Sequence, residues 1–294
     1  MSGDTLFIKP LYGDPVDNPQ IRQDGILDAL NSINTIDLTE SIVYDYNPII
    51  GYYGDTRKYS DGTAKTHYGF DYLAPKGTEV KSVHEGRIGW VRIGVTKEVE
   101  TCKIRKRILS SRTNKENCFS EEDCKTCKNN RKCYGVQMWL SWTETHAGKK
   151  TTRYAFYAHL SKLDDRIWNA IKDKISEKVI DYNPGIKVSA VGEVLGLSGC
   201  TGNAYNMKDY QQHLHFECLD AKLKKQNPNA IVKTKFELAK GLDDVDRDRR
   251  QLQKAIRPFL NNSITLSDLR EIFLSIDEKQ ETYIMIQKTE KYGE

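Results

Sequence analysis

The strongest constraint on the fold is a five-residue run in which polar and apolar side chains alternate, His213-Leu214-His215-Phe216-Glu217. Successive side chains of a β-strand point to opposite faces of a sheet, so the two histidines and the glutamate share one face. Leu214 and Phe216 then share the opposite face, where a core can bury them. The run predicts a strand that is apolar on one side and carries titratable groups on the other.

Short runs of β-type residues, separated by glycine turns, occur over much of the chain. They are Thr78–Val83, Arg87–Ile93, Val136–Trp142 and Thr151–His159. Helical spacing of apolar residues marks a segment at 164–179, a short one near 26–33 and charged segments beyond residue 234. The sequence therefore predicts a mainly β fold, α+β overall, in which antiparallel sheets form a cleft and helices lie at the periphery.

The composition is that of a folded globular chain rather than a disordered one: the 294 residues are 38% hydrophobic, 29% charged and 10% aromatic. Lys plus Arg number 45 and Asp plus Glu 41, so the net charge of +4 gives no reason to expect a nucleic-acid partner. No apolar run reaches the roughly 18 residues that cross a bilayer, so no transmembrane segment is expected. The first residues lack a basic stretch followed by an apolar one, so no ordinary secretory signal is visible.

Four of the six histidines lie in three separated segments: His67 with Asp71, His159, and the pair His213 and His215. If residues 67–71 form a strand, His67 and Asp71 point to the same side, and Gly69 between them leaves room for a third group. Two imidazoles and a carboxylate that converge suit a tetrahedral zinc ion with an open fourth position, as in catalytic sites. Such an ion acidifies water and polarises a carbonyl, so amide hydrolysis is the expected chemistry.

With their flanking stretches, these segments resemble the lysostaphin/LytM-type zinc endopeptidases. The similarity includes Gly69–Thr78, close to the family's G-x-D-x-x-A-P-x-G-T stretch, the run Gly86-Arg87-Ile88, and the turn Gly196–Ala204 before the His-x-His strand. It covers about 51–228, apart from a Cys-rich stretch and the helix after His159. Each histidine segment alone is more typical of a packed or exposed histidine than of a ligand. The prediction therefore depends on their joint occurrence.

The resemblance implies a zinc-dependent endopeptidase that hydrolyses amide bonds in the stem peptides or cross-bridges of peptidoglycan. By motif position, His67, Asp71 and His215 would hold one catalytic Zn²⁺ at the floor of the cleft. His159 and His213 would activate the water and stabilise the oxyanion, and which imidazole does which stays open. The alternative is a catalytically silent wall-binding or regulatory protein with the same fold. No ligand or catalytic position is substituted, which disfavours that alternative.

Four further residues have two interpretations each. Arg57 matches a position where the family often has arginine, or it is a solvated or structural residue. Tyr59 and Tyr157 are candidates to assist the oxyanion, although packing is the more common role of a tyrosine. Glu217 is a candidate to orient a metal-binding histidine, although an exposed strand carboxylate is the usual case.

Five of the seven cysteines lie in one polar and basic stretch: Cys102, Cys118, Cys124, Cys127 and Cys133. The stretch falls between two predicted strands, so we expect an insertion that is too polar to have its own core. Disulfides that stiffen it are the favoured interpretation. A structural metal is the second, because Cys124 and Cys127 have C-x-x-C spacing. The basic charge suits contact with anionic wall polymer, although a solvated surface is more usual.

The chain is expected to divide into an N-terminal extension (1–45), the peptidase domain (46–232) and a C-terminal helical extension (233–294). The peptidase domain would carry a Cys-rich insertion at 101–134 and a helical insertion at 164–180. Peptidoglycan is the expected partner. The enzyme is expected to be secreted, or delivered to the periplasm or cell wall without a visible signal peptide. A type VI secretion toxin or a tail lysin would arrive that way, with delivery machinery or an immunity protein as further partners.

Overall fold

The computed structural model describes residues 12–22, 51–58, 63–94, 103–110, 115–120, 122–125, 133–146, 148–176, 179–207, 211–238 and 284–286, with scattered positions between 254 and 272. Antiparallel sheets dominate this part of the chain, which confirms the predicted mainly β fold with few helices.

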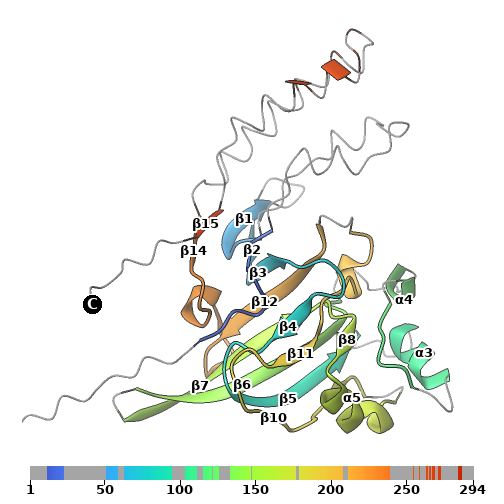
Figure 1. Cartoon of the computed structure of the whole chain (residues 1–294), viewed down its shortest axis with the longest axis vertical. Coiled ribbons are helices and arrows are strands. Elements are labelled where there is room, and N and C mark those ends of the chain that lie inside the picture. Colours follow the sequence, from blue (N-terminus) through green and yellow to red (C-terminus); the bar gives the residue numbers. More distant parts are fainter. Residues whose placement is uncertain are drawn as a thin grey trace, which may run out of the picture.

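The largest sheet has eight strands in the order β10-β5-β6-β7-β12-β13, with β9 also paired to β5 and β3 to β12 (Figure 1). Its strands are β3 (Phe70–Leu73), β5 (Gly86–Ile93), β6 (Val136–His146), β7 (Lys149–Ala158), β9 (Asp181–Tyr182), β10 (Ile186–Val188), β12 (His213–Leu219) and β13 (Lys225–Gln226). Every pairing in it is antiparallel. Strand β12 lies between β7 and β3, which places its histidines in the middle of this ladder.

Three smaller sheets surround the large one. A three-stranded sheet has the order β4-β11-β8, and two pairs are formed by β1 with β2 and by β14 with β15. Their strands are β1 (Gly54–Lys58), β2 (Ala64–His67), β4 (Glu79–Lys81), β8 (Lys162–Leu163), β11 (Val194–Leu197), β14 (Phe236–Leu238) and β15 (Ile284–Ile286). The pair β1-β2 stands next to the β3–β12 edge of the large sheet (Figure 1), so it forms one wall of the site described below.

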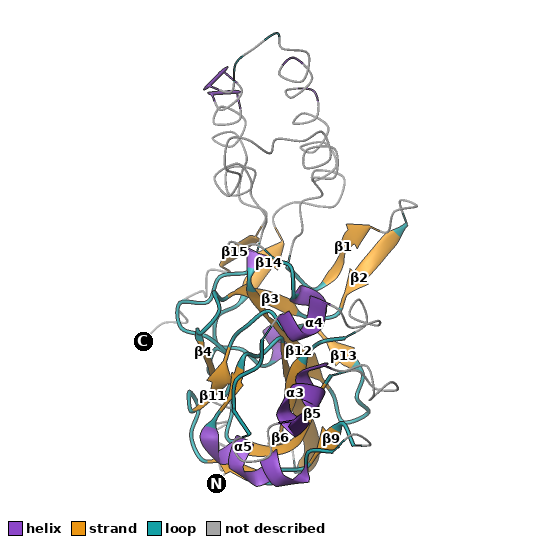
Figure 2. Cartoon of the chain, turned by 90° about the vertical axis from the view of Figure 1, so that its right-hand side faces the viewer, coloured by secondary structure: helices purple, strands orange, loops and turns teal. Residues whose placement is uncertain are grey.

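In the described ranges, the named α-helices are short and lie on the side of the sheets that faces the viewer in Figure 2. They are α3 (Lys103–Ser110), α4 (Glu122–Lys125) and α5 (Asp165–Ile171). Single 3₁₀ turns are η3 (Lys172–Lys174), η4 (Gly202–Ala204) and η6 (Pro228–Ala230). Helix α5 begins where the Asp164 side chain accepts a hydrogen bond from the backbone N–H of Arg166 at 3.0 Å, an N-cap that satisfies one of its unpaired donors. None of the helices in the described ranges is long and apolar enough to cross a membrane.

The alternation of β12 separates two environments. Leu214 and Phe216 are fully buried in the main core, together with the inward-facing residues of β3, β5, β6 and β7. The opposite face of the same strands holds a smaller apolar cluster built on Phe156, with half-buried Trp139 beside it. His213, His215 and Glu217 lie on this second face. The strand predicted over His213–Glu217 is therefore confirmed with its two faces as expected, and β12 continues to Leu219.

The predicted helix at 164–179 is shorter in the structure, where α5 and η3 end at Lys174. Its apolar stripe is buried as expected, with Ile167, Trp168 and Ile171 among the core residues. The Trp168 ring meets Phe119 at 5.7 Å between centroids, and its indole N–H donates to the Lys115 carbonyl at 3.2 Å. Both Lys115 and Phe119 belong to the Cys-rich insertion, so the two insertions pack on each other.

The Cys-rich insertion, which we expected to be too polar to have its own core, packs into the main core. Ile104 and Ile108 of α3, Phe119, and Cys124 of α4 are all buried in the main core. The polar composition is accounted for by the opposite sides of these short elements, where side chains such as Lys106 are exposed. The five described cysteines form no disulfide with one another.

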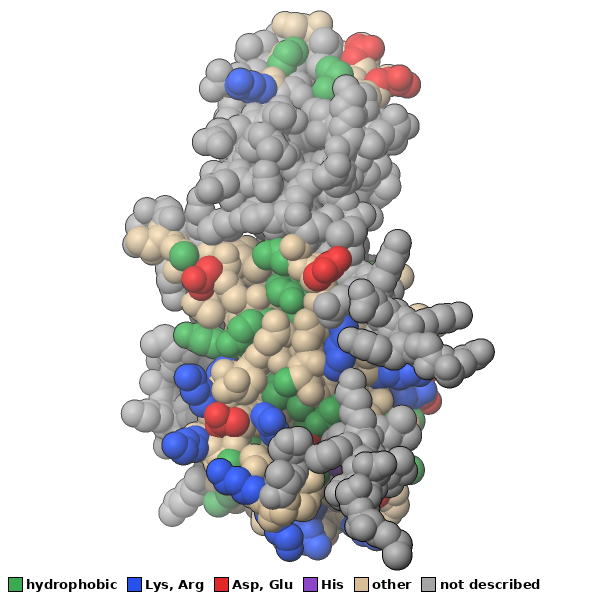
Figure 3. Space-filling model, turned by 90° about the vertical axis from the view of Figure 1, so that its left-hand side faces the viewer, with side chains coloured by type: hydrophobic (Ala, Val, Ile, Leu, Met, Phe, Trp, Pro, Cys, Tyr) green, Lys and Arg blue, Asp and Glu red, His purple; other side chains and the backbone are tan. Residues whose placement is uncertain are grey.

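Several sequence predictions fall outside the described residues. They are the helix near 26–33, Tyr59, Cys102, Cys127, most of the N-terminal extension and most of the C-terminal helices. On the face of the molecule seen in Figure 3, the described Lys and Arg side chains are spread among neutral and apolar ones rather than gathered in one patch. This distribution agrees with the small net charge.

Candidate metal centre

His67 and Asp71 reach the site from two different strands, not from one as the sequence predicted. His67 is the last residue of β2, and Asp71 lies in β3 after a break at Tyr68 and Gly69. The break transfers the chain from the β1-β2 pair to the edge of the large sheet. Gly69 is required there because a Cβ on it would lie 2.4 Å from the Phe216 carbonyl oxygen. Its role is close approach to β12, not space for a ligand.

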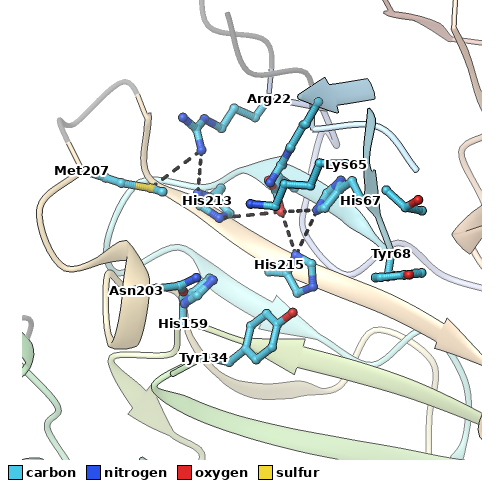
Figure 4. A pocket seen from close by; sticks show the side chains of 13 residues that line it. Arg22, Lys65, His67, Tyr68, Tyr134, His159, Asn203, Met207, His213 and His215 are labelled. Atoms are coloured by element: carbon cyan, nitrogen blue, oxygen red, sulfur yellow. Dashed lines mark hydrogen bonds and ion pairs between the residues drawn. The ribbon is translucent and has the colours of Figure 1, made fainter. Parts of the chain in front are cut away.

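Strand register brings Asp71 against His215. The two residues are directly opposite in the β3–β12 ladder, and the end of β2 places His67 beside them. The His67 Nε2 atom lies 3.3 Å from His215 Nδ1 and 3.2 Å from Asp71 Oδ1, and His215 Nδ1 lies 2.8 Å from Asp71 Oδ1. Figure 4 shows the His67 and His215 side chains pointing toward each other.

These three separations suit a metal ion. Zinc bonds of about 2.0–2.1 Å in a tetrahedral arrangement place neighbouring ligand atoms roughly 3.3 Å apart. His67, Asp71 and His215 form a group of buried side chains that could hold a metal ion, as the sequence predicted. The three atoms form one face of such a tetrahedron, which leaves a fourth position on the pocket side.

The other nitrogen of each imidazole has an acceptor. His67 Nδ1 lies 3.0 Å from the Tyr52 carbonyl oxygen, and His215 Nε2 lies 3.0 Å from Glu217 Oε1. A carbonyl oxygen only accepts, so His67 Nδ1 carries the hydrogen and His67 Nε2 keeps its lone pair. His215 has a carboxylate oxygen at each nitrogen, Asp71 at Nδ1 and Glu217 at Nε2, and metal binding through Nδ1 requires the tautomer in which Nε2 donates to Glu217.

Glu217 is buried, with only 1% of its surface exposed, so the exposed-carboxylate interpretation was wrong. Besides accepting from His215, it pairs through Oε2 with the ammonium group of Lys225 on the neighbouring strand β13. Burial lowers the pKa of Lys225 to about 8, which still leaves it mostly charged at neutral pH. Because Lys225 compensates its charge, the Glu217 carboxylate can lie buried against the His215 ring.

Asp71 is held from two sides. The Arg57 guanidinium pairs with Oδ2, which leaves Oδ1 facing the two imidazoles. Burial alone raises the pKa of Asp71, but the nearby His67, His213 and Arg57 outweigh it and hold the pKa well below its usual range. Asp71 is therefore a carboxylate, and the structural role of Arg57 is to fix which oxygen faces the site.

His159 and His213 line the same pocket as the three candidate ligands. Their rings meet edge to face at 5.1 Å between centroids. His159 Nδ1 donates to the Thr201 carbonyl at 2.8 Å, and His213 Nδ1 donates to the Gln211 carbonyl at 2.9 Å. Since each Nδ1 carries the hydrogen, each Nε2 is the basic atom. The Nε2 of His213 lies 3.7 Å from Asp71 Oδ1.

Both rings are neutral at neutral pH. Burial lowers the pKa of His159 to about 4, and His215 adds to the effect. Burial also holds the pKa of His213 well below its usual range, and the nearby Arg22 contributes in the same direction. Burial likewise lowers the pKa of the candidate ligand His67. The Asp71 carboxylate raises the pKa of all three residues, but the loss of hydration of the charged imidazole outweighs it.

His159 has a backbone conformation that is uncommon for a non-glycine residue, with φ of 64°. It directly follows the last residue of β7, and its N–H donates to the Tyr134 carbonyl at 3.1 Å. A left-handed residue costs roughly 1–2 kcal/mol. The turn ends the strand and directs the imidazole into the pocket.

The pocket contains residues that sequence reasoning did not single out. They are Arg22, Lys65, Thr66, Tyr68, Tyr134 and Met207. Tyr134 is the most informative, because its ring stacks on His215 at 5.2 Å between centroids and 26° between planes. No sequence motif marks it, and it lies at the very end of the Cys-rich insertion. By contrast, Tyr157 lies in the core against Phe216, so packing was the correct interpretation for it.

Arg22 belongs to the N-terminal extension and crosses over the site (Figure 4). Its backbone N–H donates to the Asp71 carbonyl at 2.7 Å, and Ile21 forms a bridge with Tyr72 of β3. The side chain is buried, and Nη1 lies 3.4 Å from His213 Nδ1. Because that nitrogen already donates to Gln211, this approach is a contact rather than a hydrogen bond. Part of the extension is therefore integral to the site.

No family model matches the chain, and no curated protein matches it. One similar solved structure is "Structure of Helicobacter pylori Csd3 from the orthorhombic crystal", with 18% sequence identity and a TM-score of 0.32. The match covers 72% of this chain and 42% of the other, so the chain spans less than half of that protein's length.

Proposed function

We propose that this protein is a zinc-dependent endopeptidase that hydrolyses amide bonds in peptidoglycan. The observation that carries the hydrolase part is the juxtaposition of three ligand atoms, separated by 2.8–3.3 Å, with two further neutral imidazoles in the same pocket. The choice of peptidoglycan as substrate is supported by the resemblance of the motifs around His67, His159 and His215 to the lysostaphin/LytM-type enzymes.

The donor set favours zinc over a harder ion. Two imidazole nitrogens and one carboxylate oxygen suit zinc, whereas calcium and magnesium prefer all-oxygen sites with more ligands. When bound, zinc acidifies a water molecule and polarises a carbonyl. An ion bound only through oxygen atoms, as calcium and magnesium usually are, would not use the imidazole nitrogens of His67 and His215.

The remaining groups can handle protons. His159 and His213 each present an unprotonated Nε2 to the pocket, so either can accept a proton from an attacking water and return it to the leaving amine. Burial raises the pKa of Tyr134, so its hydroxyl stays protonated and can donate a hydrogen bond to a developing oxyanion. The attacking water, the amide bond of the substrate and the side chains that carry protons would then lie in one pocket.

The direct test is digestion of purified sacculi followed by mass spectrometry of the released muropeptides. We expect new peptide ends that identify the bond cut, loss of activity with a chelator, and recovery on adding zinc. Purified protein that binds zinc at this site but leaves sacculi intact would instead support the catalytically silent, wall-binding alternative.

Two histidine variants separate the roles within the site. His215→Ala should lose the metal, because it removes a ligand. His213→Ala should keep the metal bound, while turnover falls by about 10²–10⁴-fold, the usual effect of removing a general acid–base group. Zinc content and muropeptide release are measured on the same samples. His84→Ala is the matched control, since His84 lies outside the pocket against Trp142.

A further inference from the structure

Three buried cysteines from separate segments gather around one turn. They are Cys124 on α4, Cys133 just before β6, and Cys200 just before η4, and they are 2%, 6% and 3% exposed. We call them the thiol cluster. It lies apart from the pocket lined by the candidate metal ligands. Cys200 belongs to the turn that precedes the His-x-His strand, whereas the other two belong to the Cys-rich insertion.

The turn around which the three cysteines gather is at Gly202. Its backbone N–H lies 3.1 Å from Cys124 Sγ, and Cys200 is two residues before it in the chain. A Cβ on Gly202 would lie 2.2 Å from the Cys133 carbonyl oxygen, so the segment of Cys133 packs directly on this turn. The Asn203 N–H also donates to that carbonyl at 2.6 Å. The three segments are thus fixed against one another by backbone contacts.

Two of the sulfurs receive backbone N–H groups. Gly202 N approaches Cys124 Sγ at 3.1 Å, and Gly135 N approaches Cys133 Sγ at 3.3 Å. A neutral thiol sulfur is a weak acceptor, whereas a thiolate accepts N–H donors strongly. Cys124 Sγ also lies 4.0 Å from the Ser120 carbonyl oxygen, to which a thiol can donate. The two N–H groups would stabilise each sulfur further once it bound a metal ion and lost its proton.

We propose that the thiol cluster binds a structural zinc ion, separate from the candidate catalytic ion. Soft sulfur ligands select zinc among the common divalent ions, and closed sulfur-rich sites are structural. The three sulfurs do not all lie within 4.8 Å of one another, whereas the ligand atoms of His67, Asp71 and His215 do. The cysteine side chains would therefore move closer together when the ion binds.

The proposed ion stabilises the segments that position two pocket residues. Thr201, between Cys200 and Gly202, accepts from His159 Nδ1 through its carbonyl, and Tyr134 directly follows Cys133. The Thr201 hydroxyl also donates to the Leu160 carbonyl at 3.0 Å and accepts from Val136 N at 3.1 Å. An ion at the thiol cluster would hold this turn to the insertion, and so keep His159 and Tyr134 at the pocket.

The first experiment uses the full-length protein purified with a reductant and no chelator. Metal analysis of His215→Ala, which lacks a ligand of the candidate catalytic site, should still find about one zinc per chain. A thiol-specific mercurial should release that zinc. In cobalt-substituted protein, a near-ultraviolet thiolate-to-cobalt absorption band should appear. This result stands whether or not the protein hydrolyses peptidoglycan.

Variants then assign the ligands. Cys124→Ser, Cys133→Ser and Cys200→Ser should each lose this zinc and the cobalt band, while retaining the other ion if the fold survives. Cys118→Ser is the matched control, because Cys118 lies exposed in the same insertion.

Two outcomes would overturn the proposal, and both are measured on protein without cysteine substitutions, so a variant that fails to fold cannot mask them. One is the absence of a thiolate–cobalt band and of mercurial-released zinc. The other is a disulfide between two members of the thiol cluster, found by peptide mapping of the unreduced protein.

Discussion

At the scale of single residues, each candidate metal ligand is held in one orientation by a partner on its far side. The Tyr52 carbonyl holds His67, Arg57 holds Asp71, and Glu217 holds His215. Such partners decide which atom faces the ion and how basic that atom is. The geometry of the site therefore depends on residues that never touch the metal.

Glu217 provides the clearest test of this dependence. Glu217→Ala should weaken zinc binding by about 10–100-fold, because His215 loses the acceptor that fixes its tautomer. Glu217→Gln should have a smaller effect, since the amide oxygen still accepts from Nε2 and the side-chain volume is kept. Zinc affinity is measured by competition with a chelating dye. Equal affinities for Glu217→Ala and the wild type would contradict the orienting role.

The buried, neutral histidines should make the metal-free protein sensitive to acid. The pKa of His159 is about 4 when folded and 6.5 when unfolded, so its neutral form favours folding above pH 6.5. That contribution is lost as the pH falls from 6.5 toward 4, because the unfolded chain takes up the proton first. Between about pH 7.5 and about pH 5, His159 alone should cost about 2 kcal/mol of unfolding free energy.

Urea denaturation of the chelator-treated protein at the two pH values measures this loss. His67 and His213 act in the same direction, so the total decrease should exceed the share of His159. Between the same two pH values, the unfolding free energy of His159→Gln should fall by about 2 kcal/mol less than that of the wild type. A pH slope that is identical in the two proteins would show that His159 is not neutral and buried as described.

At the scale of elements, the site is assembled where strands change sheets. Strand β2 ends at His67, the chain breaks at Tyr68 and Gly69, and β3 then joins β12 in the large sheet. His159 likewise lies just past the end of β7. Ends of strands leave the ladder of paired backbone groups, so the chain can turn there and present a side chain to a cavity.

Gly69→Ala should disturb both the fold and the site. The new Cβ would lie 2.4 Å from the Phe216 carbonyl oxygen, and backbone cannot move away as a flexible side chain can. We expect a loss of about 1–3 kcal/mol in unfolding free energy, together with weaker zinc binding, because β3 carries Asp71. Gly89→Ala is the control, since a Cβ on Gly89 meets nothing within 4 Å. Similar losses for both variants would rule out the close approach as the cause.

At the scale of the whole molecule, the Cys-rich and helical insertions are parts of one core rather than appendages. Phe119 from the first packs on Trp168 from the second, and both lie in the cluster that contains the inner faces of β5, β6, β7 and β12. Opening either insertion would expose apolar surface of the other. The described parts of these insertions should therefore unfold together with the sheets.

Phe119→Ala should consequently destabilise the entire described fold, by about 3–5 kcal/mol, in a single cooperative transition. Lys106→Ala on α3 is the control, because Lys106 is exposed and its substitution should change the unfolding free energy by less than about 0.5 kcal/mol. Thermal unfolding followed by circular dichroism and by tryptophan fluorescence measures both. Separate transitions by the two probes would mean that the insertions fold independently.

The local features of this protein follow from patterns within single segments of the chain. Alternation in His213–Glu217 was sufficient to predict a strand and its two faces, because side-chain direction on a strand depends only on position along the chain. The pattern of β-type runs and glycine turns predicted a mainly β fold for the same reason. The motif resemblance then singled out His67, Asp71 and His215, three residues that the structure does bring together.

Other features depend on contacts between distant segments, which only the folded molecule brings together. The burial of Glu217 arises from Lys225 on the next strand, and the place of Tyr134 arises from packing of an insertion against His215. Gly69 was assigned to ligand space because its true neighbour, the Phe216 carbonyl, is 147 residues away along the chain. Burial, charge pairing and ring contacts are set by which surfaces meet in space, and no pattern within a single segment contains that information.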